Sequence, residues 1–265
     1  MAQPDVLQVK SFDGTAIACW RQGSGPPLVM VHGTTGAHDS FRLLAARLDD
    51  RFTIYAVDRR GRGESGDTQP YAFEREVEDA ASAVDALDEP VNLFGHSFGA
   101  NIAVEAALVA SNLRRLVLYE PGVDVTSSSA AAIDQMEEMI ARGDREGALE
   151  FVMSRVVELR PKELDQLRRS PVWASRVAAV HTVPRELRAE IELSLEADRF
   201  AGLQVPTLLL LGSESPEWAH LATQALAAAL PDARVVLLEG QGHAATVTAP
   251  DLLASEIAGF LGEEG

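Results

Sequence analysis

Short apolar runs alternate with amphipathic stretches along the first part of the chain. Apolar runs bounded by turn residues predict strands, and apolar residues spaced three or four apart predict helices. The predicted strands are VLQVK (6–10), TAIACW (15–20), PLVMV (27–31), FTIYAVD (52–58), VNLF (91–94) and LRRLVLY (113–119). The predicted helices are FRLLAARL (41–48), FEREVEDAASAVDAL (73–87) and ANIAVEAALVA (100–110). The first two strands flank FDG, a turn sequence, and we expect them to form a hairpin.

The strand signal stops in the middle of the chain. From about Asp124 to Ala201 no run predicts a strand, and amphipathic helical patterns punctuated by prolines follow one another. Strand and helix then alternate again, in TLLLL (207–211), HLATQALAAAL (220–230), RVVLLE (234–239) and DLLASEIAGFL (251–261).

This order predicts an α/β fold with a mostly parallel, twisted sheet and helices on both faces. We assign residues 1–122 and 204–265 to the core and residues 123–203 to an inserted helical cap, or lid. Ligand sites in open α/β sheets lie beyond the carboxyl ends of the strands. An insertion that leaves one of those ends is therefore well placed to cover the site.

Composition restricts the partners and the compartment. The formal net charge of −17 disfavours binding to nucleic acid or to anionic membranes. No apolar stretch approaches the roughly 20 residues of a membrane helix, and MAQPDVLQVK lacks the pattern of a secretory signal. Cys19 is the only cysteine, so no intrachain disulfide can form. We therefore expect a cytoplasmic protein. No pattern in the sequence indicates an oligomeric state.

The most specific motif is Gly95-His96-Ser97-Phe98-Gly99, between a predicted strand and a predicted helix. A strand-to-helix turn this tight strains its central residue, and glycines on both sides remove the clash of neighbouring side chains. The turn presents the Ser97 hydroxyl at the strand tip, above a helix N-terminus whose free N–H groups carry partial positive charge. Ser97 is therefore the candidate nucleophile.

Four segments together resemble the α/β-hydrolase superfamily over nearly the whole chain: VMVHGTTG, VDRRGRGES, FGHSFGA and EGQGHAA, in that order. The chain is similar to the lidded branch that includes small esterases, lactonases, cofactor-free haloperoxidases and carbon–carbon bond hydrolases. The resemblance implies a nucleophile, an acid and a histidine base in that chain order. His243 in EGQGHAA fits the base, since an imidazole can accept the serine proton near neutral pH.

The resemblance also assigns HGTTG (32–36) to the oxyanion hole, with the backbone N–H groups of Thr34 and Phe98 as donors.

No spacing among the six histidines is typical of a metal site, and we expect neither a metal nor a cofactor. GRGESG (61–66) matches the glycine pattern of dinucleotide-binding turns, but DTQPY follows where the helix should begin. We interpret it as a structural loop, in which Asp58 pairs with the neighbouring arginines.

The residues leave the position of the acid open. Many relatives place an aspartate about three residues after the glycine that ends the seventh strand, and here that position is Ser215. Glu214 is one residue earlier. Glu120 stands at the tip of LRRLVLYEPG, where the similar haloalkane dehalogenases carry their acid. We favour Glu120, keep Glu214 as the alternative acid, and leave open that another group or none takes this role.

These features predict a serine hydrolase that cleaves a small, apolar carboxylic ester or lactone through an acyl-enzyme. Two alternatives remain. The same site is also suited to perhydrolysis, carbon–carbon bond cleavage or a cyclisation in secondary metabolism. The second alternative is a protein that binds a small ligand in this pocket without catalysis, because one fold hosts many functions.

Glu120→Gln should lower kcat by about 10³ or more, by analogy with the acids of serine triads, whereas Glu214→Gln should change it little. Steady-state kinetics of the two variants measure this difference. The opposite ranking would overturn the choice of Glu120.

Overall fold

The computed structural model describes residues 5–122, 129–192 and 196–263. Within these residues the strands form one eight-stranded sheet of order β1-β2-β4-β3-β5-β6-β7-β8. The hairpin of β1 and β2 is antiparallel, β2 pairs antiparallel with β4, and the strands from β4 to β8 are parallel. The strands are β1 (Asp5–Lys10), β2 (Ala16–Gly23), β3 (Pro27–Val31), β4 (Thr53–Val57), β5 (Val91–His96), β6 (Leu113–Tyr119), β7 (Thr207–Gly212) and β8 (Ala233–Leu238).

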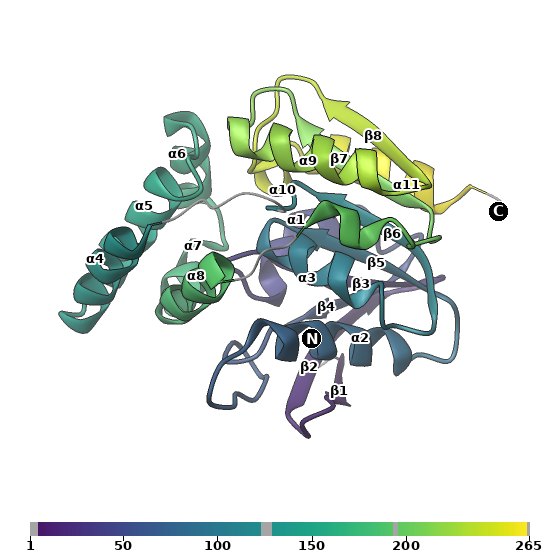
Figure 1. The fold of residues 1–265 in the computed structure, drawn as a ribbon, viewed down its shortest axis with the longest axis horizontal. Coiled ribbons are helices and arrows are strands. Elements are labelled where there is room, and N and C mark those ends of the chain that lie inside the picture. Colours follow the sequence, from purple (N-terminus) through teal and green to yellow (C-terminus); the bar gives the residue numbers. More distant parts are fainter. Residues whose placement is uncertain (1–4, 123–128, 193–195, 264–265) are drawn as a thin grey trace.

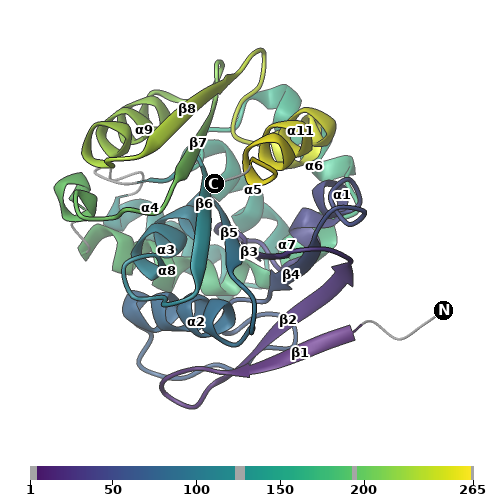
Figure 2. The same ribbon diagram turned by 90° about the vertical axis from the view of Figure 1, so that its right-hand side faces the viewer.

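Helices cover both faces of the sheet, as Figure 2 shows with the sheet nearly edge-on. One layer contains α2 (Phe73–Asp85), α3 (Phe98–Ala106) and α9 (Glu217–Ala229), and the other contains α1 (Arg42–Ala45) and α11 (Pro250–Leu261). Side chains alternate across a strand. In β3, Val29 and Val31 accordingly join the first layer's core, while Leu28 and Met30 join the second. A strand buried on both faces reads as a continuous apolar run, which explains the pattern in the sequence.

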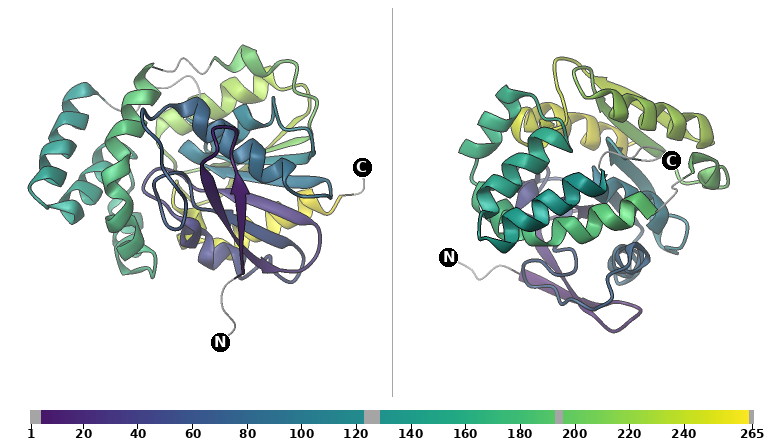
Figure 3. Two further views of the ribbon diagram at one scale, coloured as in Figure 1. Left: turned by 90° about the horizontal axis from the view of Figure 1, so that it is seen from below. Right: turned by 60° about the vertical axis from the view of Figure 1, so that its left-hand side comes forward.

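In the described part of the segment between β6 and β7, five α-helices form a separate group at one side of the sheet (Figures 1 and 3). They are α4 (Ala130–Ala141), α5 (Arg145–Arg155), α6 (Pro161–Arg169), α7 (Trp173–Ala179) and α8 (Val183–Glu192). We call this group the cap. Its apolar stripes pack mainly on one another, in a cluster that includes Ile133, Met136, Leu149, Val152 and Leu187. No strand occurs in the described part of this segment. The short helix η3 (Ala197–Phe200) packs against the core of the sheet instead.

Buried ion pairs join the cap to the core. Arg59 Nη2 lies 2.6 Å from Glu76 Oε1 in α2 and 3.3 Å from Glu186 Oε2 in α8. Arg62 pairs with the other oxygen of Glu186 and donates to the Thr182 hydroxyl at 2.7 Å. All these charged side chains are buried, so removing one partner costs about 3–5 kcal/mol. The cluster therefore fixes α8 over the edge of the sheet.

The prediction that Asp58 pairs with its neighbouring arginines is wrong. Asp58 accepts hydrogen bonds from the indole N–H of Trp20 at 2.7 Å and the backbone N–H of His38 at 2.9 Å. The ring Nδ1 of His38 lies 2.8 Å from the same carboxylate. The buried lone pairs of Asp58 are thus already occupied, and Arg60 pairs instead with Asp79, at 2.7 Å.

The GRGESG segment behaves as a loop. No helix opens within its glycines, and α2 begins only at Phe73. Among the described helices, none is long and apolar enough to cross a membrane.

Gly99→Ala should destabilise the protein, because α3 approaches β3 too closely for a side chain. A Cβ built on Gly99 would lie 2.2 Å from the carbonyl oxygen of Val31 and 2.5 Å from that of His32. Separating helix and strand by overpacking typically costs about 1–3 kcal/mol. Urea unfolding should show a lower midpoint for this variant.

Gly259→Ala in α11 is the matched control, because its added Cβ would meet no described atom within 4 Å outside the backbone of its own helix. Alanine is the better helix former, so this variant should gain about 0.8–1 kcal/mol. If both variants unfold at the same urea concentration, the close approach at Gly99 does not limit stability.

Candidate active site

Ser97 occupies a strained turn between β5 and α3. Its φ of 55° and ψ of −128° lie in a region that non-glycine residues rarely adopt. Its backbone N–H donates to the carbonyl of Tyr119 at 2.9 Å, which ties the turn to the neighbouring strand β6. A Cβ on Gly95 would lie 2.5 Å from the carbonyl oxygen of Gly99, so the tight turn depends on glycine there. The sequence motif thus produces the sharp bend expected of it.

Glu120 lies at the tip of β6 and contacts His243. Its carboxylate oxygen Oε2 is 2.5 Å from Nδ1 of His243. The other oxygen, Oε1, accepts the backbone N–H of Gly212 at 2.7 Å and the hydroxyl of Ser215 at 2.5 Å. Glu120 is fully buried and has a positive φ of 49°. The structure therefore brings the favoured acid to the imidazole and surrounds it with donors.

Glu214 does not contact His243. Its side chain is half-exposed and pairs with Arg160 of the cap. Ser215, in the position where many relatives have an aspartate, uses its hydroxyl to hold Glu120. Ser215, in the loop after β7, and His243, in the loop after β8, thus both contact the carboxylate of Glu120 at the end of β6.

Two aromatic rings hold the His243 loop. His96 Nε2–H donates to the carbonyl of His243 at 3.1 Å, and its ring stacks on Tyr119 with centroids 4.7 Å apart. The Tyr119 hydroxyl donates to the carbonyl of Gly242 and accepts the N–H of Ala245 at 3.2 Å. Burial, with His243 and a nearby arginine, lowers the pKa of His96 well below its ordinary value. Burial raises the pKa of Tyr119. Both rings therefore stay neutral at pH 7.

The HGTTG loop lies against the nucleophile. A Cβ built on Gly33 would lie 2.9 Å from Cβ of Ser97, so the backbone passes directly beside that side chain. The N–H of Thr34 makes no hydrogen bond within the described residues. Phe98 is the first residue of α3, so its N–H has no partner within the helix. Two free amides therefore flank Ser97.

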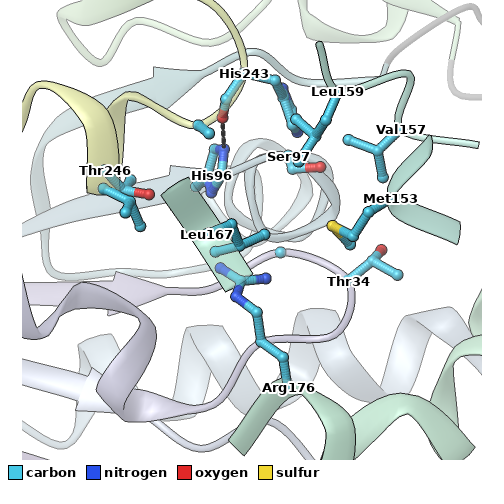
Figure 4. Close-up of a pocket in the computed structure, with 13 residues that line it drawn as sticks. Thr34, His96, Ser97, Met153, Val157, Leu159, Leu167, Arg176, His243 and Thr246 are labelled. Carbon is cyan, nitrogen blue, oxygen red and sulfur yellow. Dashed lines mark hydrogen bonds between the residues drawn. The ribbon is translucent and has the colours of Figure 1, made fainter. Parts of the chain in front are cut away.

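Ser97 and His243 line one pocket between the sheet and the cap (Figure 4). The core also contributes Gly33, Thr34, His96, Ala244, Thr246 and Val247 to its lining. The cap contributes Met153, Val157, Leu159, Leu167 and Arg176. The cap wall is thus apolar except for one arginine. A second pocket adjoins Ser97, Thr34 and Phe98 and extends toward Trp218, whose ring meets that of His243 edge-on at 5.0 Å.

The described residues contain no group of three or more His, Cys, Asp or Glu side chains arranged to hold a metal ion. The polar groups that line the pocket include the Ser97 hydroxyl, the His243 imidazole and the Arg176 guanidinium, and the buried Glu120 carboxylate lies behind the imidazole. This set is suited to acyl transfer.

Several residues of the site escaped the sequence analysis. The sequence analysis assigned no role to His96 or Tyr119, yet both hold the His243 loop. Ser215 was noted only for the aspartate it replaces. Its position three residues after Gly212 was the available signal, because a hydroxyl there can reach a carboxylate from the next strand. Arg176, on a cap helix, carried no signal in the sequence.

A family model described as the alpha/beta hydrolase family matches residues 28–256. The chain belongs to the alpha/beta hydrolase family. An alpha/beta hydrolase from Sphaerobacter thermophilus is 37% identical, with a TM-score of 0.84 over 96% of this chain and 100% of that one. The 2-(acetamidomethylene)succinate hydrolase of Mesorhizobium japonicum is 27% identical over 91% of this chain and 89% of that protein. An esterase from Exiguobacterium antarcticum, 21% identical with a TM-score of 0.78 over 97% and 99% of the chains, shares the fold.

These comparisons confirm the superfamily, the fold class and the prediction that this alpha/beta hydrolase is an enzyme. They do not support the alternative of a protein that binds a ligand without catalysis. The relatives whose names state an activity act on small molecules, which agrees with a small-molecule substrate.

Ser215→Ala should lower kcat by about 10- to 100-fold, because Glu120 loses a donor that holds it against His243. Hydrogen bonds to charged groups contribute about 1.5–3 kcal/mol. Ser213→Ala is the control, since the Ser213 hydroxyl accepts from Gly240 at 2.8 Å and does not touch Glu120. Steady-state kinetics compare the two variants. Equal kcat values would mean that the Gly212 amide alone suffices to position the carboxylate.

Proposed function

We propose that this alpha/beta hydrolase is a serine hydrolase that cleaves a small carboxylic ester or lactone through an acyl-enzyme. The observation that carries the proposal is the 2.5 Å contact between Glu120 and Nδ1 of His243. It lies beside a pocket that both His243 and Ser97 line. A base fixed by a carboxylate next to a serine at a sharp turn is the arrangement that activates a hydroxyl.

The contact with Glu120 decides which nitrogen of His243 acts as the base. A carboxylate accepts hydrogen bonds, so Nδ1 carries the proton and Nε2 is left with a free lone pair. In the proposed mechanism, Nε2 takes the proton of the Ser97 hydroxyl while the serine oxygen attacks the substrate carbonyl. Glu120 then stabilises the imidazolium that forms.

The amides of Thr34 and Phe98 are the proposed donors to the oxyanion. As the carbonyl carbon becomes tetrahedral, its oxygen gains negative charge, and two fixed N–H groups stabilise that charge without having to reorganise. The absence of other hydrogen bonds to the Thr34 amide among the described residues supports this role. The helix dipole of α3 adds to the effect at Phe98.

Collapse of the tetrahedral intermediate breaks the bond to the alcohol, which takes the proton from His243 as it leaves. Water then enters, gives a proton to His243 Nε2, and attacks the acyl-enzyme. The acid product departs and the proton returns to Ser97.

We assign the cap the role of a lid, because its apolar residues close the pocket and limit the access of water.

The name of the relative from Mesorhizobium japonicum, a hydrolase, favours hydrolysis over perhydrolysis or cyclisation. It leaves the acyl and leaving groups of this enzyme to experiment.

A fluorophosphonate probe and a panel of 4-nitrophenyl esters test the proposal. The probe should label the wild-type enzyme at Ser97, and one or more of the esters should be hydrolysed. Ser97→Ala should lose both activities, because it removes the nucleophile. Ser154→Ala, an exposed serine on α5, is the control and should keep both.

If neither labelling nor turnover is observed, Ser97 is not an activated nucleophile and the proposal fails. Labelling without turnover of any ester or lactone would contradict the proposed substrate class and favour one of the other reactions of this site.

A further inference from the structure

Arg176 stands out in the wall of the active-site pocket because it is a buried cation. It belongs to the cap helix α7, and only 7% of its surface is exposed. Figure 4 shows its guanidinium pointing from α7 into the pocket that Ser97 and His243 line. The neighbouring cap residues in this wall, Leu167 and Met153 among them, are apolar. Arg176 therefore supplies the positive charge on this side of the substrate space.

Most of the donors of Arg176 are unused. A guanidinium has five N–H donors. Among the described residues, Arg176 makes one hydrogen bond, from Nη1 to the hydroxyl of Thr35 at 2.8 Å. Its Nε is buried and has no partner in the described part of the chain. Thr35 adjoins Thr34 in the HGTTG loop, so the guanidinium is held next to the proposed oxyanion donors.

Arg176 differs from the neighbouring buried arginines in its charge partners. Arg59 and Arg62 share the carboxylates of Glu76 and Glu186, so those two cations are balanced by two anions. Arg59 and Arg62 each have a carboxylate within 4.0 Å, whereas no described carboxylate lies that close to Arg176. Asp39 attracts it from a greater distance and accepts a hydrogen bond from Ser175. Arg176 thus lacks the direct carboxylate partner that Arg59 and Arg62 have.

Arg176 stays charged at neutral pH. Burial lowers the pKa of Arg176 to about 10, an effect that Asp39 partly opposes and Arg62 reinforces. The side chain therefore remains cationic at pH 7. A buried charge without a partner is costly, and an anion entering the pocket would relieve that cost.

We propose that Arg176 binds a carboxylate of the substrate, so that the enzyme prefers esters carrying a second, free carboxylate, such as hemiesters of small dicarboxylic acids. The unused N–H groups of the guanidinium match the two oxygens of a carboxylate. In an apolar wall that excludes water, such a pair is stronger than at the surface. This inference rests on the proposed hydrolase function and replaces the expectation of a wholly apolar substrate.

Two pairs of matched esters test the preference. The first compares 4-nitrophenyl hemiglutarate with 4-nitrophenyl 5-methylhexanoate, in which an isopropyl group replaces the carboxylate of the acyl chain. The second compares 4-carboxyphenyl acetate with 4-isopropylphenyl acetate, which places the same difference in the leaving group. The wild-type enzyme should have a kcat/KM about 10- to 100-fold higher for the acidic member of one pair or both.

Arg176→Met should abolish this ratio, and Arg176→Lys, which keeps the charge without the planar fork, should retain part of it. Arg169→Met is the control. Arg169 is an exposed arginine of the same cap, so the variant removes an equal charge away from the pocket and should keep the wild-type ratio. If Arg176→Met retains the wild-type ratios for both pairs, or if the wild type shows no preference, the carboxylate site is overturned.

Thermal unfolding provides a test that needs no turnover. Glutarate, but not the neutral glutaramide, should raise the Tm of the wild type and of Arg169→Met, because a ligand that binds the folded state stabilises it. It should not raise the Tm of Arg176→Met. Equal effects of glutarate on all three proteins would contradict the site. Selective stabilisation without hydrolysis of any ester would instead support the carboxylate site while refuting the proposed function.

Discussion

A single buried carboxylate joins three strand ends at the candidate active site. Glu120, after β6, is fully enclosed, and an unpaired ionised group there would be unfavourable by several kcal/mol. It avoids this cost through the amide of Gly212, the hydroxyl of Ser215 and the imidazole of His243. These donors come from the end of β7, the loop after it and the loop after β8. The requirement to satisfy one carboxylate therefore fixes both loops relative to β6 and to the serine on β5.

The parallel sheet makes this convergence unavoidable once the strands are in register. Residues that follow neighbouring parallel strands emerge at the same edge. Tyr119 pairs with His96 across β5 and β6, which places their successors, Glu120 and Ser97, on adjacent strand tips. The same pairing stacks the two rings that hold the His243 loop. The register of the sheet thus sets both the proposed catalytic groups and their support.

The cap follows the same electrostatic constraint with one exception. Its contacts with the core include buried pairs in which each arginine meets a carboxylate, such as Arg62 with Glu186. Arg176 lies close to this cluster but has no carboxylate of its own among the described residues. A buried cation that lines a ligand pocket and has no direct carboxylate partner among the described residues has a simple interpretation: the ligand supplies the anion. The cap would then determine specificity, while the core supplies the chemistry.

The sequence by itself determined the order of strands and helices, the hairpin and the sharp turn at Ser97. These depend on local patterns, because apolar periodicity and glycine spacing act over a few residues. It also favoured Glu120, since a glutamate that ends a buried apolar strand needs a partner. Only the tertiary structure decided that Ser215 serves this carboxylate, that Asp58 bonds Trp20 and His38, and that Arg176 faces the pocket. Each of these depends on which donors and acceptors from distant segments meet in a space without water, and no local pattern specifies that.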